Sequence, residues 1–340
     1  TVYRAPELIK ENDLGKLIKE LTVATQISLN TDLGIDYFSN VEERIVLTAQ
    51  SDVVIPTGWD TVDEDIHGIG RQELILFLAP SGGGKSVGMA NLALNLCAQG
   101  FNGVYFSLEM RDKLVARRFD SMISAISGRQ IYENLQRVVD EINVFHETSG
   151  KLHIKRMREG SNANDFSAYC TDLIRKTGIK LDFIIVDYLD IAGCIDKVDS
   201  SNMFLKDKSV AEEIRALGMD FDAMMISASQ LGRDAWEKIR NNKPLGQDDI
   251  QGGMSKINTS DVVIAVIRDD AMIMSNQVRF QYLKTRNSGG VGKFRMLTWN
   301  PVSLRIKDMT EEGLTQNAVN QLNGKRPALN KPLNAFGLTN

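Results

Sequence analysis

The hydrophobic pattern from residue 52 onward alternates between short runs of apolar, β-favouring residues and longer segments with helical spacing. Several short runs are continuously apolar, which is typical of strands covered on both faces in a parallel sheet. We predict strands at 73–79, 103–108, 152–157, 182–188, 223–229 and 262–267. The segment 203–221 carries an apolar stripe of Val210, Ile214, Leu217 and Phe221, as a covering helix would. The pattern predicts an α/β domain with a mostly parallel sheet.

The C-terminal part of the chain first predicts a β-hairpin and then a polar segment without a period. Residues 277–286 and 293–299 predict a β-hairpin, because two β-favouring runs are joined by an Asn-Ser-Gly-Gly turn. Residues 310–340 then contain six Asn, two Pro and scattered polar residues without a period. Such a composition cannot bury enough apolar surface to order itself, so we predict a flexible tail.

The N-terminal segment 6–30 predicts a helix that stands apart from the α/β pattern. Its Leu14, Leu17, Ile18 and Leu21 fall on one face. An apolar stripe of this kind needs a docking partner, which is either the chain's own core or another subunit. We therefore expect a helix and connector at 1–50, the α/β domain at 51–308 and the tail at 309–340.

The charges nearly cancel, with 40 Lys and Arg against 44 Asp and Glu in 340 residues, for a net charge of −4. No overall field attracts nucleic acid, so any contact with it has to come from a local patch. The cysteines at 97, 170 and 194 have no CxxC spacing, which favours a reducing compartment. The uncharged stretch 86–108 is broken by Asn, Gln and Gly, so it predicts a helix and a strand and no membrane span.

The strongest chemical signal is the octapeptide from Ala79 to Ser86, which follows an apolar strand and precedes a helix at 87–98. Its three consecutive glycines allow backbone N–H groups to turn inward around a β-phosphate, and the helix N-terminus adds its positive dipole end. Lys85 would reach the β- and γ-phosphates, and Ser86 would ligate Mg²⁺. A glycine-rich turn that binds nothing is the alternative. The predicted nucleotide contacts in this segment are Ser81, Gly82, Gly83, Gly84, Lys85, Ser86 and Val87.

An ATPase also needs a carboxylate for Mg²⁺ and a group that orients water. Asp187 ends a strand of four apolar residues and fits the first role, with Asp190 as its nearest competitor and a turn-capping Asp as the alternative. Glu109 follows another strand and should emerge at the same sheet edge, although a solvated Glu at a helix start fits equally well. Gln230 ends a third strand, where it would sense the γ-phosphate.

Lys284 and Arg286 stand at alternate positions beside the predicted hairpin turn, so both project from one face of a strand. Two cations on a rim suit an arginine finger supplied to a neighbour's nucleotide. A solvated cationic face is the alternative.

These motifs occur in the order found in the DnaB-type replicative helicases, which are hexamers with a RecA fold. The resemblance is greatest to the replicative helicases of T-even-type phages and covers roughly residues 20–305. The Ser-Leu-Glu-Met string at 107–110 is highly specific, and through it the resemblance implies that Glu109 is the catalytic glutamate. Members of this family also have Ala, as at Ala79 here, in place of the first Gly of the usual phosphate-loop motif. The resemblance further implies nucleotide contact for Arg118, an Mg²⁺ site at Ser86 and Asp187, sensing by Gln230, and catalytic roles for Lys85, Lys284 and Arg286.

In this family, loops near the central channel of the ring hold single-stranded DNA, and the matching segment here is 249–256. Its glycines leave the backbone free to approach phosphates, and Lys256 is its only cation. Gln251 stands where bacterial members have Arg, so we expect backbone contacts there in place of a salt bridge. An ordinary flexible loop is the alternative. The predicted DNA contacts are Ile250, Gln251, Gly252, Gly253, Met254, Ser255 and Lys256.

The resemblance implies a homo-hexameric helicase motor that uses ATP and Mg²⁺ on single-stranded DNA in the cytoplasm, without a membrane partner. The family's N-terminal collar domain has no match in this chain, so the helix at 6–30 would be the linker that docks onto the adjacent subunit in relatives. Primase, a helicase loader or a single-strand-binding protein are expected partners, and the tail segment 333–338 is either a docking peptide or an inert end. A RecA- or clock-type ATPase and a nucleotide-dependent assembly platform are the alternatives.

Overall fold

The computed structural model describes residues 35–51, 54–196, 203–240, 245, 254–286 and 288–309. The predicted helix at 6–30, the tail from 310 onward and residues 249–253 of the predicted DNA segment lie outside these residues. Contacts within the chain divide it into two compact units after Val53. In the first unit, residues 41–51 form helix α3 (Val41–Ser51).

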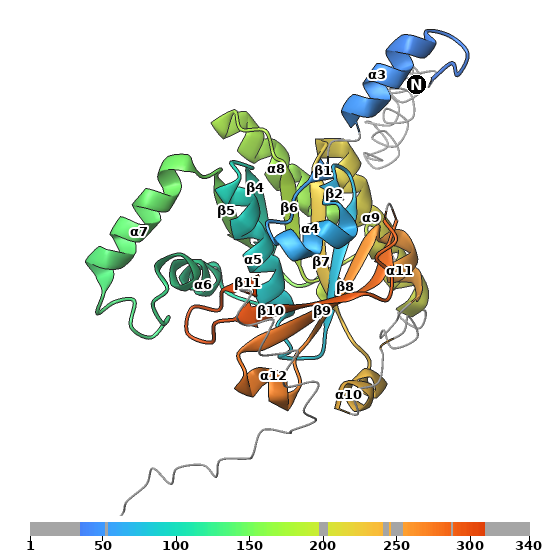
Figure 1. Ribbon diagram of the computed structural model, residues 1–340. Coiled ribbons are helices and arrows are strands. Elements are labelled where there is room, and N and C mark those ends of the chain that lie inside the picture. Colours follow the sequence, from blue (N-terminus) through green and yellow to red (C-terminus); the bar gives the residue numbers. More distant parts are fainter. Residues whose placement is uncertain are drawn as a thin grey trace, which may run out of the picture. The chain divides into compact units, whose positions relative to one another are not determined.

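A nine-stranded sheet is the centre of the second unit (Figure 1). Its strands are β3 (Leu74–Ala79), β4 (Gly103–Ser107), β5 (Leu152–Arg156), β6 (Phe183–Asp187), β7 (Met224–Gln230), β8 (Val262–Ile267), β9 (Gln277–Thr285), β10 (Phe294–Trp299) and β11 (Ile306–Asp308). They lie in the order β11-β10-β9-β8-β3-β7-β6-β4-β5. Strands β3 to β8 are parallel, whereas β9, β10 and β11 pair antiparallel. The six predicted strands and the hairpin are confirmed.

Helices cover both faces of this sheet (Figure 1). The described helices of this unit are α4 (Asp60–Ile66), α5 (Lys85–Ala98), α6 (Asp112–Ser124), α7 (Leu135–Thr148), α8 (Ala163–Thr177), the 3-10 turn η2 (Leu189–Ile191), α9 (Met203–Phe221), α10 (Arg233–Arg240), α11 (Met254–Thr259) and α12 (Asp270–Met274). Helices α4, α5 and α6 contribute to the core on one face, and α8, α9, α10 and α11 contribute to the core on the other. None of the described helices combines the length and the apolar character needed to cross a bilayer.

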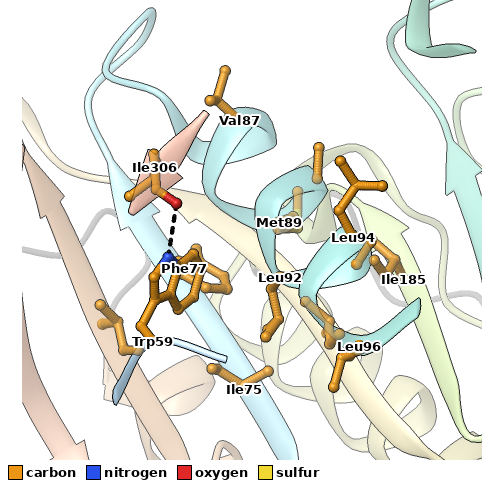
Figure 2. Packing of buried hydrophobic residues seen from close by; sticks show 14 of the residues in the cluster. Trp59, Ile75, Phe77, Val87, Met89, Leu92, Leu94, Leu96, Ile185 and Ile306 are labelled. Carbon is orange, nitrogen blue, oxygen red and sulfur yellow. Dashed lines mark hydrogen bonds between the residues drawn. The ribbon is translucent and has the colours of Figure 1, made fainter. Parts of the chain in front are cut away.

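Alternation along β3 shows how one strand serves both cores. Ile75 and Phe77 belong to the core that contains α5, whereas Leu74 and Leu76 belong to the opposite core, as the period of two in a strand requires. The core around α5 is closed by Trp59, whose Nε1 donates a hydrogen bond to the Ile306 carbonyl at 3.0 Å (Figure 2). This packing fixes α5, and with it the loop that precedes the helix.

Three short strands were not predicted from the sequence. Strands β1 (Val54–Ile55) and β2 (Ile69–Gly70) pair antiparallel as a separate two-stranded sheet, and β11 extends the main sheet beyond β10. Each has only two or three residues, which is too short for a periodic pattern to appear.

Candidate nucleotide site

The loop between β3 and α5 has the backbone conformation of a phosphate cradle. Gly82 and Gly84 adopt φ values of 72° and 103°, which side chains with a Cβ rarely adopt, and the Gly83 N–H donates to the Pro80 carbonyl at 2.9 Å. A Cβ on Gly84 would lie 2.7 Å from the ring of Trp299, whereas nothing lies within 4 Å of one on Gly82. The loop is therefore shaped by its glycines and supported by the end of β10.

The N-terminus of α5 directly follows this loop. The N-terminus of α5 has no side-chain cap among the described residues, so its N–H groups can serve an anion. Of the predicted contacts, Ser81 is exposed in the loop. Val87 is only 8% exposed and belongs to the hydrophobic core (Figure 2), so it can offer a nucleotide only its backbone.

The two predicted Mg²⁺ ligands lie side by side. The Ser86 hydroxyl donates to Oδ1 of Asp187 at 3.1 Å, and the buried Tyr105 hydroxyl donates to Oδ2 at 2.6 Å. Burial raises the pKa of Asp187, while the hydrogen bonds from Tyr105 and Ser86 lower it. The charge of Arg118, on α6, lowers the same pKa. A hydroxyl and a carboxylate fit Mg²⁺, which binds hard oxygen ligands and usually takes few from the protein.

Lys85 stands among the other predicted catalytic groups. Its Nζ lies 5.0 Å from the centre of the Tyr188 ring. Burial lowers the pKa of Lys85, and the negative charges of Asp190, Glu109 and Asp187 raise it. The charges of these three carboxylates therefore act on the ammonium that a triphosphate would meet.

Strand register explains why residues distant in sequence meet here. Ala79 on β3 is paired with Gln230 on β7, and Ser107 on β4 is paired with Asp187 on β6. Because parallel strands end at the same sheet edge, Glu109, two residues beyond β4, emerges there too, and its side chain is exposed. The phosphate loop, the Mg²⁺ carboxylate, the glutamate and the glutamine thus share one edge, which we call the C-terminal edge.

The predicted finger lies at the opposite edge. The Lys284 Nζ donates to the carbonyl oxygens of Ile257 and Asn258 at 2.7 and 2.9 Å, and Arg286 forms an ion pair with Asp261. Asp261 precedes β8, where its backbone N–H donates to the carbonyl at the beginning of β3. The whole of β3, about 17 Å of extended chain, separates this edge from the phosphate loop. Within one protomer, the predicted finger and the predicted nucleotide site therefore lie at opposite ends of β3.

Comparison with known proteins decides the family. The family described as "DnaB-like helicase C terminal domain" matches residues 54–308. The chain belongs to this family. The DnaB-like replicative helicase of Enterobacteria phage T4 is 26% identical over 285 residues, covering 82% of this chain and 59% of that protein. Replicative DNA helicase DnaC of Bacillus subtilis is 27% identical over 257 residues, covering 70% and 52%. The chain thus spans between half and three fifths of the length of these relatives.

Solved structures confirm the predicted RecA-like fold of this DnaB-like chain. One solved ATPase domain superposes with a TM-score of 0.68 at 18% identity, covering 80% of this chain and 99% of that one. A DnaB-like replicative helicase, described with its interactions with primase, superposes with a TM-score of 0.71 at 17% identity, covering 91% and 75%.

The structure places Lys256 of the DnaB-like chain differently from the predicted DNA contact. Its side chain is only 3% exposed, and its Nζ lies 2.5 Å from Asp190 and 3.0 Å from Asp207. Two carboxylates stabilise the ammonium inside the protein, where no DNA phosphate reaches it. Ser255 is also buried, at 4% exposure, so α11 presents neither side chain to a strand of DNA.

Two residues that contact the predicted site residues, Tyr105 and Asp261, were not predicted from the sequence. Tyr105 lies in a strand buried on both faces, and its hydroxyl needed a partner there, which was a usable signal. Asp261 bears a charge at 0% exposure beside an apolar strand, which likewise indicates a buried ion pair.

Proposed function

We propose that the chain is the motor of an ATP-dependent replicative DNA helicase that works as a homo-hexameric ring on single-stranded DNA. The observation that carries this proposal is the separation of the phosphate loop and the cations Lys284 and Arg286 onto opposite sheet edges. A head-to-tail ring brings the C-terminal edge of one subunit against the other edge of the next. Membership of the DnaB-like family supports the same arrangement.

Within one subunit, the C-terminal edge would bind ATP and prepare it for attack by water. Ser86 and Asp187 would hold Mg²⁺, which supplies neutralising charge at the phosphates when bound. Lys85 and the N–H groups of the loop and of α5 would bind the β- and γ-phosphates, with Arg118 nearby. Glu109 would orient the attacking water and accept its proton.

The neighbouring subunit would complete the site. The Arg286 side chain is half exposed even though it pairs with Asp261, so part of its guanidinium remains available at the rim. A guanidinium there would stabilise the charge that develops on the γ-phosphate in the transition state. Gln230, at the end of β7, would report the loss of that phosphate to the rest of the subunit.

The DNA and the protein partners follow from the family. The segment 249–253 would approach DNA through its backbone, since Lys256 is engaged inside the protein. The helix predicted at 6–30 would dock onto the adjacent subunit. Primase is the first partner to test, because a similar solved helicase is described with its interactions with primase; a loader and a single-strand-binding protein come next.

An ATPase assay with and without single-stranded DNA, combined with mass measurement in the presence of a non-hydrolysable ATP analogue, tests this proposal. We expect DNA to stimulate hydrolysis and the analogue to stabilise a hexamer. A hexamer whose rate of ATP hydrolysis is the same with and without single-stranded DNA would indicate an assembly platform. A filament that coats DNA would indicate a RecA-type protein. Either result would refute the helicase proposal.

A further inference from the structure

The buried amine of Lys256 joins three segments of the chain. Lys256 lies in the first turn of α11, and its Nζ contacts Oδ1 of Asp190 at 2.5 Å, Oδ2 of Asp207 at 3.0 Å and Oγ of Ser229 at 3.3 Å. These partners come from η2, α9 and β7 respectively. The three contacts match the three N–H donors of an ammonium group.

Asp190 is the centre of this cluster and also holds the end of β7. Its Oδ1 accepts a hydrogen bond from the Ser229 hydroxyl at 2.6 Å, and its Oδ2 accepts the Gln230 N–H at 2.8 Å. Asp190 follows Asp187 by three residues, so one carboxylate joins the segment after the Mg²⁺ ligand to the residue placed to sense the γ-phosphate.

The chemistry of the cluster exceeds what packing requires. Ile257, the next residue of α11, belongs to the hydrophobic core, and an apolar side chain at 256 would avoid the cost of burying a charge. Burying the ammonium instead makes α11 and η2 dependent on one another, because moving either separates Lys256 from Asp190 and leaves a buried charge without that partner. Asp190 in turn accepts the hydrogen bonds from the end of β7.

We propose that Lys256 is a positioning residue that couples the nucleotide site to the DNA loop. Through Asp190 it ties the first turn of α11, which forms the C-terminal part of the predicted DNA segment 249–256, to the Gln230 end of β7. A shift of Gln230 on loss of the γ-phosphate would move the C-terminal anchor of that segment. The proposal rests on the proposed helicase function and replaces the DNA contact predicted for Lys256.

Lys256→Met tests the coupling, and Asp207→Asn is its matched control, because Asp207 pairs with the same amine whereas the carboxylate that accepts hydrogen bonds from the end of β7 is Asp190. The readouts are DNA stimulation of hydrolysis and the ratio of DNA affinities with an ATP analogue and with ADP. We expect Lys256→Met to retain basal hydrolysis within about 2-fold and to lose about 5-fold or more of both ratios, within the usual range of coupling between sites. Asp207→Asn should retain both ratios within about 2-fold.

Lys256→Met leaves the carboxylates of Asp190 and Asp207 without their ammonium partner. The double variant Asp190→Asn with Lys256→Met removes one of these two unpaired charges and serves as the test if the single variant does not fold. It should lose both ratios to the same extent as Lys256→Met, because the two residues act as one unit. Retained stimulation in a folded Lys256→Met protein or in the folded double variant, or an equal loss in Asp207→Asn, would overturn the coupling role alone. A wild-type protein that DNA does not stimulate would overturn the helicase proposal and the coupling with it.

Discussion

The Nη1 atom of Arg286 lies 2.6 Å from Oδ1 of Asp261, a carboxylate with no exposed surface at the beginning of β8. The same carboxylate accepts hydrogen bonds from Arg215 at 3.0 and 3.1 Å and from the Leu74 N–H at 3.0 Å. A fully buried anchor therefore sets the direction of the guanidinium at the sheet edge opposite the phosphate loop. In the proposed ring, this anchor would orient Arg286 toward the nucleotide site of a second subunit.

Replacing Arg286 with Ala should reduce hydrolysis roughly 10³-fold or more, as in other enzymes that lose an arginine finger. Nucleotide affinity should remain mostly intact, since the phosphate loop of the binding subunit is untouched. Turnover measurements and titration with a fluorescent ATP analogue separate the two effects. Arg175→Ala, at an exposed position on α8, is the control. Near-normal turnover of Arg286→Ala would refute the finger.

Tyr105→Phe removes one hydroxyl from beneath Asp187 and leaves the aromatic ring in place. We expect the Mg²⁺ concentration that supports half-maximal hydrolysis to rise about 10-fold or more, since partners that orient a metal ligand typically contribute roughly 10–100-fold in affinity or activity. Mg²⁺ titrations of hydrolysis and of nucleotide binding measure the shift. Tyr169→Phe, in the opposite core region, should leave the Mg²⁺ requirement unchanged. An unaltered requirement in Tyr105→Phe would show that Asp187 is oriented without it.

The phosphate loop contains two glycines with positive φ, of which Gly84 alone of the two has a ring against its Cβ position. Gly82→Ala imposes only an unfavourable φ and should cost about 1–2 kcal/mol of unfolding free energy. Gly84→Ala adds an overlap with the Trp299 ring and should cost more than Gly82→Ala by about 1–3 kcal/mol. Denaturant unfolding of the two variants without nucleotide compares them. Equal losses would mean that Trp299 moves aside at little cost.

Most of the fold was predictable because its strands are buried on both faces. The residues of β6 are apolar up to Asp187, and a run of that kind followed by a charge announces both the strand and its functional end. The C-terminal edge followed from the same logic, since parallel strands that end in polar residues must present them together.

The ion pairs were not predictable, because hydrophobic periodicity carries no information about which charges meet. Lys256 and Asp190 are separated by 66 positions, and only the fold, which packs α11 on α9 and α9 on η2, brings them together. In the sequence, Lys256 is the single cation of a glycine-containing segment, which favours a surface role. Its burial depends on two carboxylates from other elements.

Asp65 should make unfolding dependent on pH. The hydrogen bonds from Arg295, at 2.6 and 2.9 Å, hold the pKa of Asp65 below its ordinary value of 3.8. A carboxyl whose pKa is lower in the folded state stabilises the fold above its unfolded pKa, and this contribution is lost as the pH falls through the folded pKa. Asp65→Asn should therefore lose about 1–3 kcal/mol at neutral pH.

The difference between Asp65→Asn and the wild type should begin to shrink below about pH 4, where the unfolded carboxyl takes up its proton, and should shrink further as the pH falls through the lower folded pKa. Urea unfolding across this pH range measures it. Glu64→Gln is the control, because Glu64 contacts the same arginine at 3.3 Å but is 66% exposed, and its loss should stay below about 0.5 kcal/mol. A difference between Asp65→Asn and wild type that is independent of pH would exclude the ion pair as its cause.

Sharing of each nucleotide by two subunits is tested most directly by mixing two inactive variants. Lys85→Ala lacks the phosphate-binding ammonium but keeps the finger, and Arg286→Ala has the reverse defect. In an equimolar co-assembled ring, roughly a quarter of the interfaces join an intact phosphate loop to an intact finger. We expect ATP hydrolysis to reappear in the mixed ring while each variant alone stays inactive. A mixed ring as inactive as its parents would contradict the shared site.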